Sequence, residues 1–259
     1  MALLHSFEKS GSFLFRYRGQ IPILILIFGL VFLWFSNPII LLYVHTLASP
    51  WVYPFVVALS ILVSVCGFAI RAYTVGTTPS GTSGRNTTKQ MANELNTKGI
   101  YSIVRHPLYL GNYLMWAGLL IFTMNLPLFL IISLFYWLYY ERIMFTEERY
   151  LESQFGDIYL EWSKKVPAFI PNFHLFQKGD IPFSLKTVLR REYTGVLVMV
   201  FSFVLMDYFL AFLTNSIMGL AWEWCKPSLF ILLFFFVLTM VLRSLKHYTS
   251  VLNPEDNRD

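Results

Sequence analysis

Charged side chains are scarce in this chain: they make up 14% of its 259 residues, whereas hydrophobic residues make up 56%. A soluble domain usually carries about 25% charged residues, so the composition excludes an ordinary soluble fold and predicts a membrane protein. The aromatic content of 18% agrees, because Trp and Tyr collect at membrane–water interfaces.

Cysteine is nearly absent as well. The chain has two cysteines, Cys66 and Cys225, without metal-ligand spacing, which excludes a disulfide framework and predicts no metal site. A cleaved signal peptide is not expected either, since the apolar stretch after Arg18 is too long and no small-residue cleavage site follows it. The net charge of +5 predicts no nucleic-acid partner, because the placement of the basic residues explains it.

Two long segments, 19–70 and 107–140, contain no Asp, Glu, Lys or Arg. A transmembrane helix needs about 20 apolar residues, so the first segment holds two spans, with a turn at Ser49-Pro50 and a kink at Asn37-Pro38. The second is divided at Asn125-Leu126-Pro127 into two short helices that form a hairpin or extend into flanking residues. Two further spans are predicted at 193–213 and 228–242. The expected fold is all-α, with six spans.

The basic residues predict the orientation of these spans. With the N-terminus inside, 19 of the 20 Lys and Arg residues fall on the inner side and only Lys226 lies outside. Cytoplasmic loops carry such an excess, so both termini are expected in the cytoplasm. The expected location is a bacterial inner membrane, or the endoplasmic reticulum in a eukaryote.

The polar residues gather at the inner mouths of the spans. The run Arg105-His106-Pro107-Leu108-Tyr109-Leu110-Gly111 enters the third span, and Glu147-Glu148 follows the fourth. Charged groups are costly there unless they are used, so the sequence predicts one site at the membrane surface. The alternatives are an Arg105 that only reaches lipid headgroups and carboxylates that only pair with Arg142 and Arg149.

The segments around these motifs predict the walls of the site. The Gly-rich loop 74–99 brings backbone amides close to a ligand or is a plain connector. Glu147-Glu148 is expected to begin a separate amphipathic helix, interrupted by Gly156 and followed by an extended segment at Pro167 and Pro171. One face of this helix is predicted to consist of Glu148, Leu151, Phe155, Ile158 and Trp162.

Residues 71–171 resemble the superfamily of isoprenylcysteine carboxyl methyltransferases and phospholipid methyltransferases, which are integral membrane enzymes. The resemblance rests on the run 99–111, on Glu147-Glu148-Arg149-Tyr150-Leu151, and on Phe155-Gly156 followed by Tyr159 and the segment 166–171. It implies S-adenosylmethionine as the methyl donor. It also divides the chain into an N-terminal hairpin (1–70), a methyltransferase core (71–171) and a C-terminal two-span extension (172–259).

The resemblance also implies residue roles. Arg105 and Glu148 are expected nearest the methyl transfer, and Arg85 and Trp162 are expected at the substrate. At two positions the chain departs from the usual residues of the superfamily, with Ala168 in place of a basic residue and Trp162 in place of a Tyr. These departures indicate that the far rim of the pocket differs. The residues expected to bind the cofactor are Gly99, Tyr101, His106, Pro107, Tyr109, Gly111, Glu147 and Tyr159.

The methyl acceptor stays open between a prenylated cysteine, a phospholipid amine and a lipid phosphate. An anionic acceptor needs no base and suits a bidentate contact from Arg105, whereas an amine would need Glu148 as the base. Arg85 beside Arg105 favours a carboxylate or phosphate, and the motif at 82–87 favours a bacterial source.

Other protein classes remain possible. A membrane sterol-type reductase shares a related core but uses NADPH, and the double Glu argues for the methyltransferase instead. A transporter is disfavoured, because the spans carry almost no charged groups at mid-depth.

Overall fold

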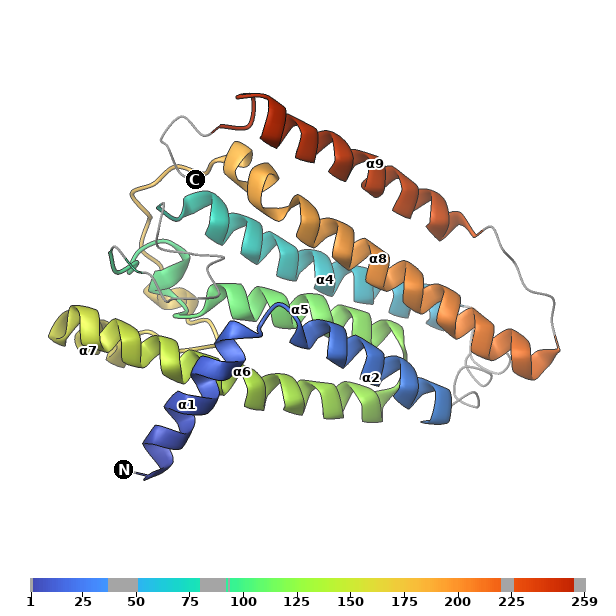
Figure 1. The fold of residues 1–259 in the computed structure, drawn as a ribbon, viewed down its shortest axis with the longest axis horizontal. Coiled ribbons are helices and arrows are strands. Elements are labelled where there is room, and N and C mark those ends of the chain that lie inside the picture. The colour runs from blue at the N-terminus through green and yellow to red at the C-terminus, as the bar shows by residue number, and fades with distance from the viewer. Residues whose placement is uncertain (1, 37–50, 80–91, 93, 220–225, 254–259) are drawn as a thin grey trace.

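The structure is a computed structural model that describes residues 2–36, 51–79, 92, 94–219 and 226–253. The predicted all-α class is confirmed, and the described residues contain no strand beyond an isolated bridge between Gly99 and Gln177. Figure 1 shows a bundle of long, roughly aligned helices. Two short 3₁₀ turns lie in its loops. The elements are α1 (Ala2–Arg16), α2 (Ile21–Ser36), α4 (Val52–Thr77), η1 (Ile100–Ser102), α5 (Pro107–Phe122), α6 (Leu126–Phe155), α7 (Asp157–Lys165), η2 (Phe173–Leu175), α8 (Leu185–Met218) and α9 (Pro227–Tyr248).

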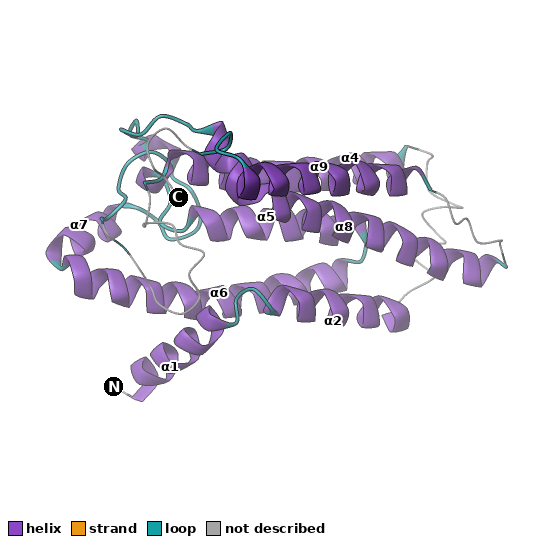
Figure 2. Cartoon of the chain, turned by 45° about the horizontal axis from the view of Figure 1, so that its top comes forward, coloured by secondary structure: helices purple, strands orange, loops and turns teal. Residues whose placement is uncertain are grey.

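The bundle has two layers, with α2 and α6 in one and α4, α5, α8 and α9 in the other (Figure 2). Most of the loops that carry the predicted site lie at the same end of the bundle, where α7 also projects. Helix α1 turns away from α2 by 85° and packs on α6 near this end.

Four of the described helices, α4, α6, α8 and α9, are long and apolar enough to cross a membrane, and the bent pair α1–α2 adds a fifth if it counts as one span. Helix α5 is apolar but has only 16 residues. The prediction of a multi-span membrane protein is therefore confirmed. The number of six spans and the cytoplasmic termini remain predictions, and the predicted kink at Asn37-Pro38 and turn at Ser49-Pro50 lie outside the described residues.

The prediction of a separate amphipathic helix beginning at Glu147-Glu148 is wrong. Helix α6 runs without interruption from Leu126 to Phe155, because no Gly or Pro lies near the two carboxylates, and Glu, Arg and Leu there favour helix. The break comes at Gly156, as predicted, where φ is +53°. This break redirects α7, so Ile158 is 68% exposed and does not share the buried face expected for it.

Helices α4 and α5 pack closely because small residues line their contact. A Cβ atom added to Gly118 would lie 2.1 Å from Ser64 Oγ, and one added to Gly111 would lie 2.7 Å from the Gly67 carbonyl oxygen. Ser64 also donates a hydrogen bond of 2.9 Å to the Met115 carbonyl. This close approach holds α5, and the motif at its N-terminus, firmly against α4.

Polar contacts attach the C-terminal helices to the rest of the bundle. Arg71 on α4 forms a two-pronged ion pair with Glu192 on α8, with N–O distances of 2.9 and 3.1 Å, and donates to Asn112 on α5 at 2.6 Å. At the other end, Asp207 on α8 pairs with Lys226, the residue before α9, at 2.9 Å. The predicted boundary at residue 70 falls inside α4.

Candidate active site

The loop 99–106 is held against the segment 166–177 by backbone hydrogen bonds. The amide of Arg105 donates to the Pro167 carbonyl at 2.9 Å, and the amide of His106 donates to the Ala168 carbonyl at 3.1 Å. The two prolines keep 166–172 non-helical, as predicted, so its carbonyls are available to this loop. The segment therefore fixes the backbone from which both side chains leave.

Arg105 and Glu148 form the centre of the site. Nε of Arg105 lies 3.0 Å from one carboxylate oxygen of Glu148, and Nη2 lies 3.3 Å from the other. Nη1 donates to the carbonyls of Ser163 and Val166. Four of the five guanidinium N–H groups thus have partners, which leaves one for a ligand. The predicted bidentate contact from Arg105 to an anionic acceptor, which needs two N–H groups, does not fit this arrangement.

The second carboxylate, Glu147, faces a different set of partners. The Tyr109 hydroxyl donates to it at 2.6 Å, and Arg18 Nη1 lies 3.5 Å from the same oxygen. His106 bridges the two carboxylates, with Nε2 2.8 Å from Glu148 and Nδ1 3.7 Å from Glu147. The structure therefore brings together the residues that the sequence placed forty positions apart.

Two donors of α7 complete this side of the site. The Trp162 indole Nε1 is buried and has no hydrogen-bond partner among the described residues. The Tyr159 hydroxyl is also buried, and it lies near Glu148. Burial, and then the negative charge of Glu148, raise the pKa of Tyr159 above its ordinary value. Its hydroxyl therefore remains a protonated donor at neutral pH. An unpaired buried donor such as the Trp162 indole is rare and is available to a ligand.

The remaining predicted residues lie along the entry to α5. Gly99 has a φ of +61° and starts η1, and burial raises the pKa of the nearby Tyr101. Pro107 occupies the first turn of α5 and is buried. Gly111 lies in the contact between α4 and α5, where a Cβ atom would meet Arg71, so close helix packing accounts for it. Their roles toward the cofactor remain predictions.

Sequence reasoning missed Arg18, which it counted only as an inner positive charge. Its position just before an uncharged run gave no sign that it reaches a residue 129 positions later in the sequence. Arg85, predicted at the substrate, lies outside the described residues. Within the described chain, no group of three or more His, Cys, Asp or Glu side chains is arranged to hold a metal ion.

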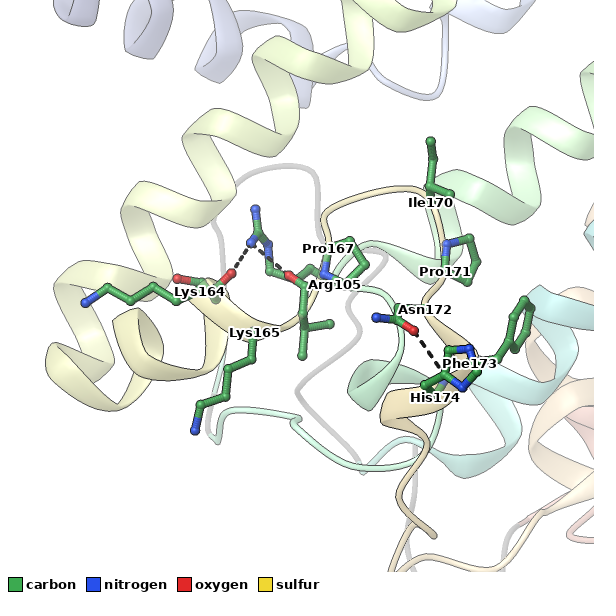
Figure 3. A pocket seen from close by; sticks show the side chains of 11 residues that line it. Arg105, Lys164, Lys165, Pro167, Ile170, Pro171, Asn172, Phe173 and His174 are labelled. Carbon is green, nitrogen blue, oxygen red and sulfur yellow. Dashed lines mark hydrogen bonds between the residues drawn. The ribbon is translucent and has the colours of Figure 1, made fainter.

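A pocket of about 690 Å³ lies between the end of α7 and η2, and Arg105 is one of its lining residues (Figure 3). The ionisable side chains among its lining residues are Arg105, Lys164, Lys165 and His174, and none of the lining residues is acidic. The pocket therefore favours a negatively charged group.

Comparison with known proteins identifies the part of the chain that contains the cluster. Residues 55–158 match the phospholipid methyltransferase family. This match confirms the resemblance expected from the motifs, and it covers most of α4, all of α5 and α6, and the start of α7. It leaves out α1 and α2 and the two C-terminal helices.

Curated relatives match over similar lengths. A protein-S-isoprenylcysteine O-methyltransferase of Schizosaccharomyces pombe is 43% identical over 77 residues, which are 30% of this chain and 33% of that protein. The cobalt-zinc-cadmium resistance protein CzcN of Cupriavidus metallidurans is 38% identical over 85 residues, 33% of this chain and 39% of that one. Protein-S-isoprenylcysteine O-methyltransferase B of Arabidopsis thaliana is 34% identical over 97 residues, 35% and 49% of the two chains.

The chain thus spans a third to a half of the length of these relatives. No solved structure matches it.

Proposed function

We propose that this chain catalyses methyl transfer from S-adenosylmethionine to an anionic oxygen of a lipid or lipidated acceptor in the membrane. The observation that carries this proposal is the cluster of Arg105, His106, Glu148, Glu147 and Tyr109, which lies within the stretch that matches the phospholipid methyltransferase family. Two of the relatives described above are named as O-methyltransferases of isoprenylcysteine.

The residues present suit S-adenosylmethionine. Its ammonium group is complementary to the carboxylate of Glu147, and its hydrogen-bond acceptors are complementary to the unpaired indole donor of Trp162. When bound, this cofactor supplies an electrophilic methyl group. The chain's own contribution is to bind and orient the reactants, and correct positioning can account for much of such a rate enhancement.

The charges around Arg105 favour an anionic acceptor. A carboxylate or phosphate oxygen is already deprotonated, so the site needs a cation to hold it and no general base. Arg105 has one N–H left for such an oxygen, and Glu148 fixes the guanidinium for this contact. The pocket beside it adds Lys164, Lys165 and His174. A phospholipid amine acceptor would instead require Glu148 as a base, although the structure shows this carboxylate paired with two partners.

The location of this activity is part of the proposal. The site lies at the end of the bundle that the basic residues predict to be cytoplasmic, where a water-soluble cofactor can enter. The acceptor reaches the site laterally from the bilayer. The membrane is the inner membrane in a bacterial source and the endoplasmic reticulum in a eukaryotic one.

Three acceptor classes can be compared directly. We would incubate the purified protein in lipid nanodiscs with methyl-labelled S-adenosylmethionine and a farnesylcysteine analogue, phosphatidylethanolamine or a lipid with a terminal phosphate. Mild alkali releases methanol from a carboxyl ester but not from a methylated amine or a methyl phosphate. Separate incubations, one for each acceptor, and chromatography of the labelled lipid distinguish the last two products. Label in a carboxyl or phosphate ester is the expected result, and label only in the amine would contradict the proposal.

The matched variants are Glu148→Gln and Glu152→Gln. Glu148→Gln removes the charge that holds Arg105 and His106, and hydrogen bonds to charged groups contribute about 1.5–3 kcal/mol, so transfer should fall roughly ten- to hundredfold. Glu152 pairs with Arg149 on the exposed side of α6, so Glu152→Gln should change transfer less than about twofold. Equal effects of the two variants would remove Glu148 from the mechanism.

A further inference from the structure

Helix α1 is fixed to the outside of α6 at the end that carries the site. The Phe7 ring packs edge-on against Phe145 with 5.6 Å between centroids, and the Arg142 guanidinium lies 3.5 Å above the Phe7 ring. Gly11 is buried in the same contact, where a Cβ atom would meet Thr146. One face of α1 is therefore committed to α6.

The rest of α1 divides into an apolar sector and a basic sector. At 100° per residue, Leu3, Phe13 and the following Tyr17 project within about 80° of one another, and they are 70%, 60% and 37% exposed. Lys9 and Arg16 are seven residues apart, share the neighbouring sector, and are also exposed. Exposed aromatic and aliphatic side chains beside a row of cations are typical of helices that lie in a membrane interface.

The angle between α1 and α2 gives α1 its direction. If α2 crosses the bilayer along its normal, a bend of 85° places α1 almost parallel to the membrane plane. The short connection at residues 17–20 keeps it at the level where α2 enters the membrane.

We propose that α1 lies in the headgroup region at the site end of the bundle and binds anionic lipid. In this arrangement Leu3, Phe13 and Tyr17 enter the boundary of the acyl chains, and Lys9 and Arg16 contact lipid phosphates. Each cation near an anionic surface strengthens such binding by roughly fivefold.

The consequence for the site rests on the proposed function. The last turn of α1 contains Phe15, which is buried in the same cluster as Tyr109, and two residues after α1 comes Arg18, which lies 3.5 Å from Glu147. Lipid that holds α1 against α6 therefore also holds Arg18 beside Glu147. Anionic lipid should accordingly change the affinity for S-adenosylhomocysteine.

The position of α1 can be measured without any assay of methyl transfer. In a chain with both native cysteines replaced, Phe13→Cys and Ser12→Cys would each carry an environment-sensitive fluorophore in nanodiscs with brominated acyl chains. Position 12 lies next to the basic sector and serves as the matched site. Quenching at 13 but not at 12 is expected, and it should increase when phosphatidylglycerol is added to phosphatidylcholine.

Two double variants test the role of charge. Lys9→Gln with Arg16→Gln should abolish the effect of phosphatidylglycerol on quenching at 13 and on S-adenosylhomocysteine affinity, while both retain their values in phosphatidylcholine. Lys178→Gln with Arg243→Gln removes the same charge from exposed positions elsewhere and should retain the effect.

Three outcomes would overturn the proposal. Absence of quenching at 13 would place α1 in water, and equal quenching at 12 and 13 would make it part of a broken span. Loss of the lipid effect in both double variants would assign that effect to net charge. Quenching as expected without any methyl transfer would contradict only the proposed function.

Discussion

Trp162 has a buried indole N–H without a partner among the described residues. The sequence predicted it at the substrate, but it lies against Tyr159, which was predicted at the cofactor, so the cofactor is the ligand proposed for it. If a ligand accepts this hydrogen bond, Trp162→Phe removes the bond and retains most of the ring. A typical hydrogen bond contributes about 0.5–1.5 kcal/mol, so calorimetry should show S-adenosylhomocysteine affinity reduced by roughly two- to tenfold. The melting temperature of the free protein should stay the same or rise, because an unsatisfied buried donor is removed.

Trp51→Phe is the matched control, because Trp51 is exposed outside the site and its replacement should change neither quantity. Unchanged affinity in Trp162→Phe, together with a lower melting temperature, would show that the indole serves the fold and not a ligand.

At the scale of single residues, the sequence predicted the central contacts but not their geometry. Arg105, His106 and Glu148 were expected together, because charged groups at the mouths of spans are costly unless they are used. The partners of Arg105 among backbone carbonyls could not be predicted, since they depend on how the segment 166–172 folds back. Gly111 shows the same limit, because a glycine in a motif does not reveal whether a ligand or a neighbouring helix needs the space.

Close packing of α4 and α5 is the property of these elements that a single methyl group can test. In Gly118→Ala the new Cβ atom would lie 2.1 Å from Ser64 Oγ and 2.3 Å from the Ser60 carbonyl oxygen, and the latter is backbone that cannot move alone. Overpacking of this kind costs about 1–3 kcal/mol. Thermal unfolding of the detergent-solubilised protein should therefore begin at a clearly lower temperature.

Gly29→Ala in α2 provides the comparison, because nothing lies within 4 Å of the added Cβ atom. Alanine favours helix over glycine, so this variant should melt at the same temperature or slightly higher. A Gly118→Ala protein as stable as the original would show that α4 and α5 lie further apart.

At the scale of elements, helices formed by uncharged apolar sequence were predicted well, whereas helices that also contain charged residues were not. The predicted division at Asn125 is confirmed: the Leu128 amide donates a hydrogen bond to the Asn125 side chain, which caps α6, and Pro127 occupies the first turn. The continuation of α6 past Glu148 was missed because a change in polarity was taken as a helix end. Helix α1 was missed because Glu8, Lys9 and Arg16 interrupt its apolar residues, although the apolar residues recur with helical periodicity in the sequence.

At the scale of the whole molecule, the part that matches the family does not stand alone. The match ends at residue 158, and the sequence suggested a separate C-terminal extension. In the structure α8 packs on α4 and α5, and its Glu192 accepts hydrogen bonds from Arg71, which also holds Asn112 five residues after the start of α5. The extension is thereby joined to the helix whose N-terminus carries the site.

This connection predicts that Glu192→Gln destabilises the chain as one unit. Glu192 is 3% exposed, and the substitution leaves Arg71 as a charge without its partner, which costs about 3–5 kcal/mol for a buried pair. Arg71→Gln together with Glu192→Gln removes both charges and should recover part of the loss. Asp180→Asn, which breaks an exposed pair with Lys98, should change stability little.

The measurement is a titration with a denaturing detergent, during which unfolding is monitored. Glu192→Gln should unfold in a single transition at a lower detergent concentration than the original protein. Two transitions, with only one of them shifted, would mean instead that the last two helices fold independently of the site.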